Sequence, residues 1–194
     1  MKSYSLHVKH KKNQDSKPII FESAGLTLLG CFDGLGGSGI YKSRPLGSED
    51  FVPSSYHASR MYGQTVSELV EKQGTKINLE SISEALADSM VNIPQKFEEK
   101  PPMMKSKLAK RFASTCVILK LQEDGDRLEV ESYWSGDSRA YLFDSHFGLV
   151  QLTKDDVLDG LDPYQNRTGA PMSCLLYTSP SPRDATLSRM PSSA

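Results

Sequence analysis

The sequence predicts an α+β fold, in which antiparallel strands precede and follow a pair of helices. Three observations indicate it: an apolar run at 25–32 that ends in Asp-Gly, two segments between 54 and 93 with helical apolar spacing, and strand-forming residues from 112 to 152. Strands, then helices, then strands are typical of α+β proteins rather than of βαβ repeats. A chain of 194 residues is expected to form one domain.

The first half of the chain alternates between clear elements and a predicted loop. The apolar run at 25–32 lies between a glycine and an Asp-Gly pair, which is typical of a buried strand. Residues 40–53 contain Pro45, Gly47 and Pro53 and are expected to form a loop. A helix is predicted from Ser54 or Ser55 to Gly74, because apolar side chains recur every three or four residues.

The second half changes from helical to strand periodicity. A second helix is predicted from an N-cap at Asn78 to a stop at Pro94. Its apolar stripe is Leu79, Ile82, Leu86, Met90 and Ile93. Residues 100–111 form a basic connector, and short strands follow up to residue 152. Their alternation favours an antiparallel meander with one solvated edge or face.

Composition excludes several classes of function. The 23 basic and 24 acidic residues leave a net charge of −1, which argues against nucleic-acid binding by bulk charge. No apolar run approaches the ~18 residues of a membrane span. The first residues lack the apolar central region of a signal peptide. Cys31, Cys116 and Cys174 are widely spaced, so free thiols in a reducing cytoplasm are expected. The first two lie in apolar strands and are expected to be buried.

The strongest local feature is Asp33, at the end of the first predicted strand. Gly34 follows it and can expose its carbonyl group. Carboxylate and carbonyl oxygens are hard ligands that suit Mg²⁺ or Mn²⁺. Asp15, after a polar stretch, and Asp137, between two predicted strands, are candidates for further carboxylate ligands. The alternatives are a plain Asp-Gly turn at Asp33 and a tight hairpin at Asp137.

Other chemistries find less support in the sequence. Gly34, Gly36 and Gly39 match the spacing of a dinucleotide fingerprint, but no helix opens directly after them and no parallel alternation follows. The histidines lack the spacing of a zinc site, and Ser138 lacks the context of a serine nucleophile. The basic run from Lys105 to Arg111 is either a solvated connector or a docking surface for an acidic phosphoprotein.

Four short blocks carry a resemblance to a known family. They are Asn13-Gln14-Asp15-Ser16, Phe32-Asp33-Gly34-Leu35-Gly36-Gly37, Ala113-Ser114-Thr115-Cys116 and Ser135-Gly136-Asp137-Ser138-Arg139-Ala140-Tyr141-Leu142, the last trailed by Leu152-Thr153-Lys154-Asp155-Asp156. In this order, with two amphipathic helices between the second and third, they resemble the bacterial metal-dependent protein phosphatases of the type 2C Ser/Thr phosphatase family. The match covers about residues 4–173.

The resemblance implies a sandwich of two antiparallel β-sheets flanked by helices, with two Mn²⁺ or Mg²⁺ ions in the cleft between the sheets. Asp33 would be the catalytic bridging ligand, and the Gly34 carbonyl would bind one ion. Asp15 would hold an ion directly or through water, and Asp137 would serve a third, weaker site. A metal-activated water would attack the phosphorus of phosphoserine or phosphothreonine in line. The implied partners are a phosphorylated protein and a cognate Ser/Thr kinase.

Two departures from the family's pattern bear on activity. His10, with Lys11 beside it, stands at the position of the family's phosphate-binding arginine, and imidazole cannot make the bidentate contact of arginine. The family's later Asp-Gly-x-x-Asp and Asp-Asn blocks are absent. Residues 174–194 resemble translated adapter sequence and are expected to be a disordered, non-native tail.

Residues 1–173 are therefore expected to form a partial phosphatase domain, weakly active or inactive. His10 and Lys11 are the candidate phosphate-binding residues, with His10 in a catalytic role. The alternative is a degenerate phosphatase fold that binds phosphoproteins without cleaving them. Composition and resemblance together indicate a cytoplasmic protein with no nucleic-acid or membrane partner.

Overall fold

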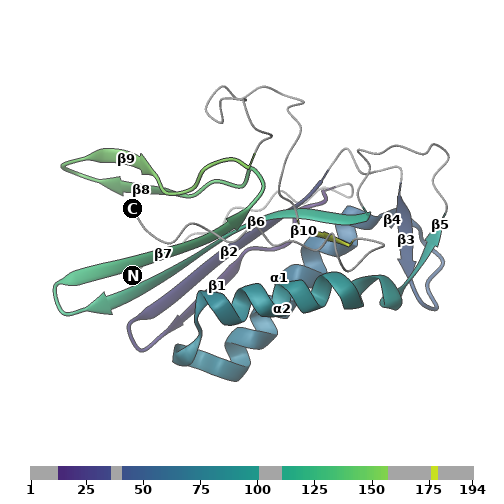
Figure 1. The fold of residues 1–194 in the computed structure, drawn as a ribbon, viewed down its shortest axis with the longest axis horizontal. Helices are drawn as coiled ribbons and strands as arrows, with labels where there is room; N and C mark the ends of the chain where they lie inside the picture. Colours follow the sequence, from purple (N-terminus) through teal and green to yellow (C-terminus); the bar gives the residue numbers. More distant parts are fainter. Residues whose placement is uncertain (1–12, 36–40, 101–110, 157–175, 179–194) are drawn as a thin grey trace.

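A computed structural model of the chain describes residues 13–35, 41–100, 111–156 and 176–178. The fold is α+β, as predicted. The main sheet is antiparallel and has β6 at its centre (Figure 1). Its strands are β1 (Ile19–Ser23), β2 (Leu26–Gly34), β6 (Arg111–Asp124), β7 (Arg127–Ser135) and β10 (Leu176–Thr178). The strand β2 pairs along one edge of β6. The other edge of β6 is therefore shared by β7 and β10.

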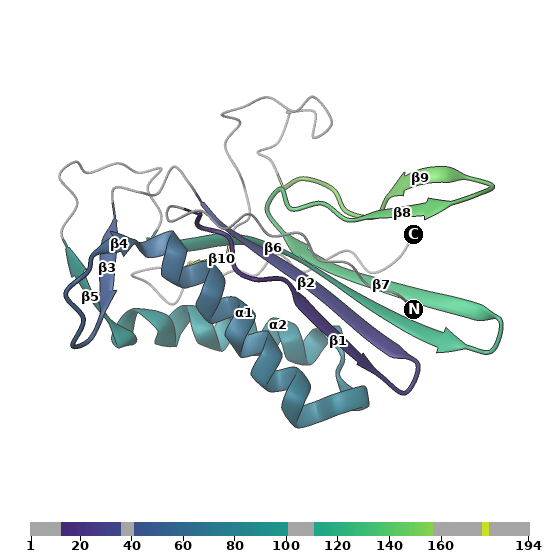
Figure 2. The same cartoon turned by 180° about the vertical axis from the view of Figure 1, so that it is seen from behind.

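Two smaller sheets accompany the main sheet. The first is formed by β3 (Lys42–Pro45), β4 (Val52–Pro53) and β5 (Phe97–Lys100), with β3 in the middle. The second is a hairpin of β8 (Tyr141–Asp144) and β9 (Gly148–Gln151). In both ribbon views this hairpin lies on the side of the main sheet away from the helices (Figures 1 and 2).

Both predicted helices are present. The helix α1 (Ser54–Gln73) ends at Gly74, whose φ of 56° is a conformation that suits glycine. The helix α2 (Leu79–Asn92) begins after Asn78, whose Oδ1 accepts a hydrogen bond of 2.8 Å from the amide of Ser81. Short 3₁₀ turns follow the helices, η2 (Gly74–Lys76) and η3 (Ile93–Lys96), the second containing Pro94.

The core lies between α1, α2 and one face of the main sheet. Phe32 of β2 and Phe112 and Ile118 of β6 are almost fully buried there, against the apolar stripes of the helices. Burial of each such side chain contributes roughly 1.5–3 kcal/mol. The fully buried Tyr62 of α1 donates a hydrogen bond of 3.3 Å from its hydroxyl to the carbonyl of Phe112. This contact fixes α1 against the beginning of β6.

Three sequence predictions need correction. Residues 40–53 do not form a plain loop, because they contain β3 and β4. Cys31 is exposed, whereas Cys116 is buried as expected. The reason is that burial alternates along β2, so that Phe32 faces the helices and Cys31 faces the opposite side. The strands β8 and β9 pair with each other and not with β7, so the predicted meander is interrupted after β7.

The C-terminal part of the chain is described only at β10, which pairs with Ser114 and Arg111 of β6. The sequence predicted no regular structure within residues 174–194, and the rest of this stretch lies outside the described residues. Among the helices that are described, none combines the length and the apolar character needed to cross a membrane.

Candidate metal centre at the ends of β2 and β7

The topology of the main sheet brings Asp33 and Asp137 to the same end of the molecule. Both β2 and β7 run antiparallel to β6, so both end beside the first residues of β6. Asp33 pairs with Thr115 on one edge of β6, and β7 ends with Ser135 opposite Cys116 on the other edge. Asp137 lies two residues beyond this end. The two aspartates therefore approach the start of β6 from either side.

Asp15 reaches the same place along a separate segment. The amide of Ser16 donates a hydrogen bond of 2.9 Å to the carbonyl of Phe32, which holds this segment beside the end of β2. Withdrawal from water, a hydrogen bond to the Asp15 carboxyl group and the charges of Asp15 and Asp137 together raise the pKa of Asp33 to about 7. Asp15 and Asp137 thus both act on Asp33.

Hydroxyl groups at the start of β6 tie the two strand ends together. Ser114 and Thr115 are buried. The Oγ of Ser114 donates a hydrogen bond of 2.8 Å to the carbonyl of Asp33. The Oγ1 of Thr115 lies 2.6 Å from the Oγ of Ser138, next to Asp137 in sequence. The Ala-Ser-Thr block therefore supports the backbone that carries two of the carboxylates.

Gly34 is required by close packing at the end of β2. A Cβ atom at this position would lie 2.6 Å from the carbonyl oxygen of Ser55 and 2.8 Å from that of Gln14. Both contacts are to backbone atoms, which cannot rotate away as a flexible side chain can. Only glycine lets β2, the segment before Asp15 and the beginning of α1 meet at one point.

The first turns of α1 hold the segment before Asp15. The Oγ of Ser59 donates a hydrogen bond of 2.5 Å to the carbonyl of Gln14, and the Oγ of Ser55 donates to the Oε1 of the same residue. The guanidinium group of Arg60 donates to the carbonyls of Asn13 and Gln14. The sequence reasoning missed Ser55, Ser59 and Arg60. The two serines lie on the buried face of an otherwise amphipathic helix, which is the signal that could have identified them.

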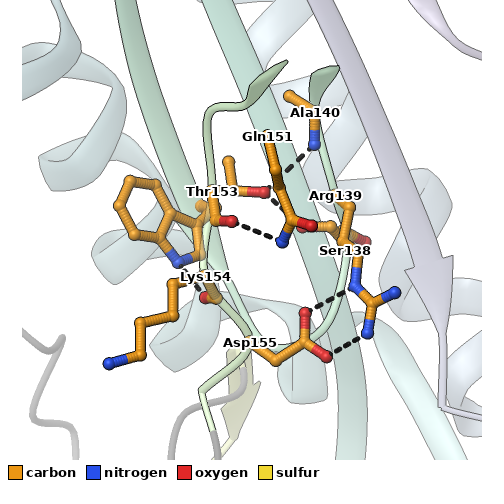
Figure 3. Close-up of polar contacts among 8 residues, drawn as sticks. Ser138, Arg139, Ala140, Gln151, Thr153, Lys154 and Asp155 are labelled. Carbon is orange, nitrogen blue, oxygen red and sulfur yellow. Dashed lines mark hydrogen bonds and ion pairs between the residues drawn. The ribbon is translucent and has the colours of Figure 1, made fainter. Parts of the chain in front are cut away.

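The loop that carries Asp137 is held by residues that follow β9. Asp155 binds the guanidinium group of Arg139 through two contacts, 2.7 Å from Nε to Oδ1 and 2.5 Å from Nη2 to Oδ2 (Figure 3). The Oδ2 of Asp156 accepts a hydrogen bond of 2.8 Å from the amide of Gly136. The carboxyl groups of Asp155 and Asp156 thus hold the Gly-Asp-Ser-Arg loop in place.

Thr153 and its neighbours complete this support. The Oγ1 of Thr153 accepts a hydrogen bond of 3.0 Å from the amide of Ala140, and its carbonyl accepts one of 2.7 Å from the side chain of Gln151 (Figure 3). The indole of Trp134 donates to the carbonyl of Lys154 at 2.7 Å. The Leu-Thr-Lys-Asp-Asp segment is therefore a brace for the end of β7.

The donor chemistry of the site suits a hard divalent cation. Asp15 and Asp137 both act on Asp33, and none of the four ion pairs formed by the described residues involves any of these three aspartates. A divalent cation would offset this concentration of negative charge. In the described part of the chain, no three His, Cys, Asp or Glu side chains are arranged closely enough to hold an ion as they lie. Asp15 and Asp33 share a hydrogen bond, whereas Asp137 acts on Asp33 through its charge.

The other candidate residues lie outside the described residues or away from the three aspartates. His10, Lys11, Gly36 and Gly39 lie outside the described residues. His57 is a packing residue, with its ring centroid 4.4 Å from that of Phe97. A cavity of about 500 Å³ between α1 and residues 16–19 does not include the three aspartates. Of the predicted ligands, Asp15 therefore contacts Asp33, beside Gly34, whereas Asp137 acts on Asp33 through its charge alone.

Comparison with known proteins adds no assignment. Neither a scan against models of protein families nor a search of curated protein sequences finds a match for this chain.

Proposed function

We propose that this chain carries part of the active site of a metal-dependent phosphoprotein phosphatase that hydrolyses phosphoserine or phosphothreonine. The observation that supports it is the pKa of Asp33, which withdrawal from water, a hydrogen bond to Asp15 and the charges of Asp15 and Asp137 together raise to about 7. In this proposal Asp15, Asp33 and the Gly34 carbonyl hold Mn²⁺ or Mg²⁺, and Asp137 serves a third ion. Carboxylate and carbonyl oxygens are the ligands these cations prefer.

Each residue of the site has a distinct role in the proposal. Bound divalent cations would activate a water molecule and offset negative charge on the phosphoryl oxygens. Asp33 would release its shared proton on binding a cation, because a cation and a proton compete for the same carboxylate. Ser114 and the Thr115–Ser138 contact hold the two strand ends at a fixed separation. His10 and Lys11 supply positive charge to the phosphate group.

We also propose the two-sheet sandwich for the complete fold. The face of the main sheet away from the helices carries apolar side chains from all three central strands, among them Leu29, Val117, Leu121, Val130 and Trp134. The β8–β9 hairpin lies on that side and exposes further apolar residues, with Phe143 74% and Phe147 84% accessible. Apolar surface on both elements supports a second layer packed against this face.

The experiment is a phosphate-release assay on the full chain with a phosphothreonine peptide, with and without Mn²⁺. We expect weak release that requires the metal ion. Asp33→Asn should abolish it, and the control Asp126→Asn, an exposed acid in the β6–β7 turn, should not. Release that is independent of Mn²⁺, or unchanged in Asp33→Asn, would contradict the proposal. Peptide binding with neither metal binding nor release would favour the non-catalytic phosphoprotein-binding module.

A further inference from the structure

Arg60 donates hydrogen bonds to main-chain atoms of the segment before Asp15. Its Nη1 donates a hydrogen bond of 3.3 Å to the carbonyl of Gln14, and its Nη2 donates one of 3.3 Å to the carbonyl of Asn13. Ser59 donates to the same Gln14 carbonyl at 2.5 Å. Main-chain contacts of this kind fix where a segment lies without depending on its side chains. They therefore determine the position of the residue that follows, Asp15.

Arg60 is itself fixed on α1. Its Cζ lies 3.5 Å from the centroid of the Tyr56 ring, a cation–π contact, and its Nη1 also donates to the Tyr56 carbonyl at 2.9 Å. None of the ion pairs among the described residues includes Arg60. Its guanidinium group thus donates to three carbonyl oxygens and lies over an aromatic ring. A planar group with several N–H donors can make all of these contacts at once.

The Asp15 backbone is held from two directions. The Asp15 amide donates a hydrogen bond of 3.0 Å to the Oδ1 of Asn13. This bond ties Asp15 to Asn13, whose carbonyl accepts a hydrogen bond from Arg60. On its other side the amide of Ser16 is bonded to Phe32 of β2 at 2.9 Å. Arg60 thus connects the segment to α1, and Ser16 connects it to the strand that carries Asp33. The separation of the two carboxyl groups follows from these connections.

We infer that Arg60 is a positioning residue of the proposed metal centre: by gripping the carbonyls of Asn13 and Gln14 it holds the Asp15 carboxyl group beside Asp33 and so sets the affinity for the divalent cation. The inference rests on the proposed function, because it needs the carboxylates to bind an ion. It assigns to α1, which carries none of the three aspartates, control over the geometry of the ligands.

The test measures Mn²⁺ dissociation constants by electron paramagnetic resonance. Arg60→Gln should weaken binding about 10-fold or more, the loss typical when a residue supporting a metal ligand is removed. Arg60→Lys keeps the charge but lacks the fork, so it should recover part of the affinity. Arg127→Gln, the same change at an exposed residue in β7, is the matched control and should leave the affinity unchanged.

A second readout does not need the metal. In the metal-free protein, Arg60→Gln should shift the Asp15 amide signal in a ¹H–¹⁵N spectrum, while the signals of β7 stay in place. Arg60→Lys, which keeps the charge but lacks the fork of donors, replaces Arg60→Gln if that variant fails to fold. A folded Arg60→Gln protein with wild-type Mn²⁺ affinity would overturn the inference alone. Absence of Mn²⁺ binding by the wild-type chain would overturn the proposed function as well.

Discussion

The carboxyl groups of Asp15 and Asp33 share a hydrogen bond. Two carboxyl groups can do this only when one of them carries a proton, because ionised carboxylates have no donor. The pKa of Asp33, raised to about 7 by withdrawal from water and by its two acidic neighbours, is consistent with that proton residing on Asp33. A divalent cation placed between the two groups would displace the proton and satisfy both oxygens.

Mn²⁺ affinity should therefore depend on pH. As the pH rises through about 7, Asp33 loses its proton, competition with the cation disappears and binding tightens by up to about 10-fold per pH unit below that value. Calorimetric titration in buffers of different ionisation enthalpy measures the protons released. We expect net proton release at about pH 6 and much less at about pH 8. A pH-independent affinity with no proton release would show that Asp33 is not a ligand.

The stability of the metal-free protein should fall as the pH rises. The folded state raises the pKa of Asp33 from 3.8 to about 7. The contribution of Asp33 to stability is therefore complete below the pKa of the unfolded state and is lost as the pH rises through the pKa of the folded state. An amide side chain cannot ionise, so Asp33→Asn should exceed the wild type in stability by about 1–2 kcal/mol at about pH 8, a value reduced for partial exposure. Urea unfolding at low and high pH measures this, and a constant difference between the two proteins would contradict it.

Replacing Gly34 with alanine should be strongly destabilising. The added Cβ would lie 2.6 Å and 2.8 Å from two backbone oxygens, and overpacking of this kind costs about 2–3 kcal/mol. Gly30→Ala is the matched control on the same strand, because its Cβ would meet other atoms at 3.5 Å or more. Urea unfolding of both variants checks the prediction. Equal stability of the two would show that the packing around Gly34 can relax.

Breaking the Arg139–Asp155 pair should cost more than breaking an exposed pair. The Asp155 side chain is only 8% exposed, so Arg139→Gln leaves a nearly buried carboxylate without its partner, at a cost of about 2–3 kcal/mol. The control is Arg44→Gln, whose partner Glu98 is 52% exposed and whose pair contributes about 0–1 kcal/mol. Thermal unfolding measures both, and similar losses would mean that the brace of the Asp137 loop contributes little.

His10→Arg should improve recognition of phosphate. A guanidinium group makes paired charge-assisted contacts that imidazole cannot, so KM for a phosphopeptide should fall about 3–10-fold with kcat little changed. His7→Arg adds the same group three positions earlier and serves as the control. Equal effects of the two substitutions would indicate a general gain of positive charge and no specific site at His10.

The helices and the long strands could be predicted because their residues carry a local signal. The stripes of α1 and α2, the N-cap at Asn78 and the stop at Gly74 all follow from short-range chemistry. The strands β3 and β4 could not be recognised in this way. They have four and two residues, too few to establish a period of two, and Pro45 and Pro53 argue for a loop.

The residues of the candidate site likewise fall into those that the sequence predicted and those that it did not. A strand that ends in Asp-Gly identified Asp33, and positions after a polar stretch and between two predicted strands made Asp15 and Asp137 candidates. The resemblance to a known family then gave each of the three a role. The hydrogen bonds from Ser55, Ser59 and Arg60 to Asn13 and Gln14 depend on where α1 crosses the segment before Asp15. The spacing of residues within the helix does not predict where that crossing occurs. The separation of the β8–β9 hairpin from β7 is likewise a matter of pairing, which local alternation does not determine.

The central claim is that Asp15, Asp33 and Asp137 form a binding site for divalent cations. Electron paramagnetic resonance of Mn²⁺ titrated into the wild-type chain, Asp33→Asn and Asp126→Asn at about pH 8, where Asp33 is ionised, tests it most directly. We predict saturable binding by the wild type and Asp126→Asn, and at least about 10-fold weaker binding by Asp33→Asn. Identical titrations for all three proteins, or no saturable binding by the wild type, would contradict the claim.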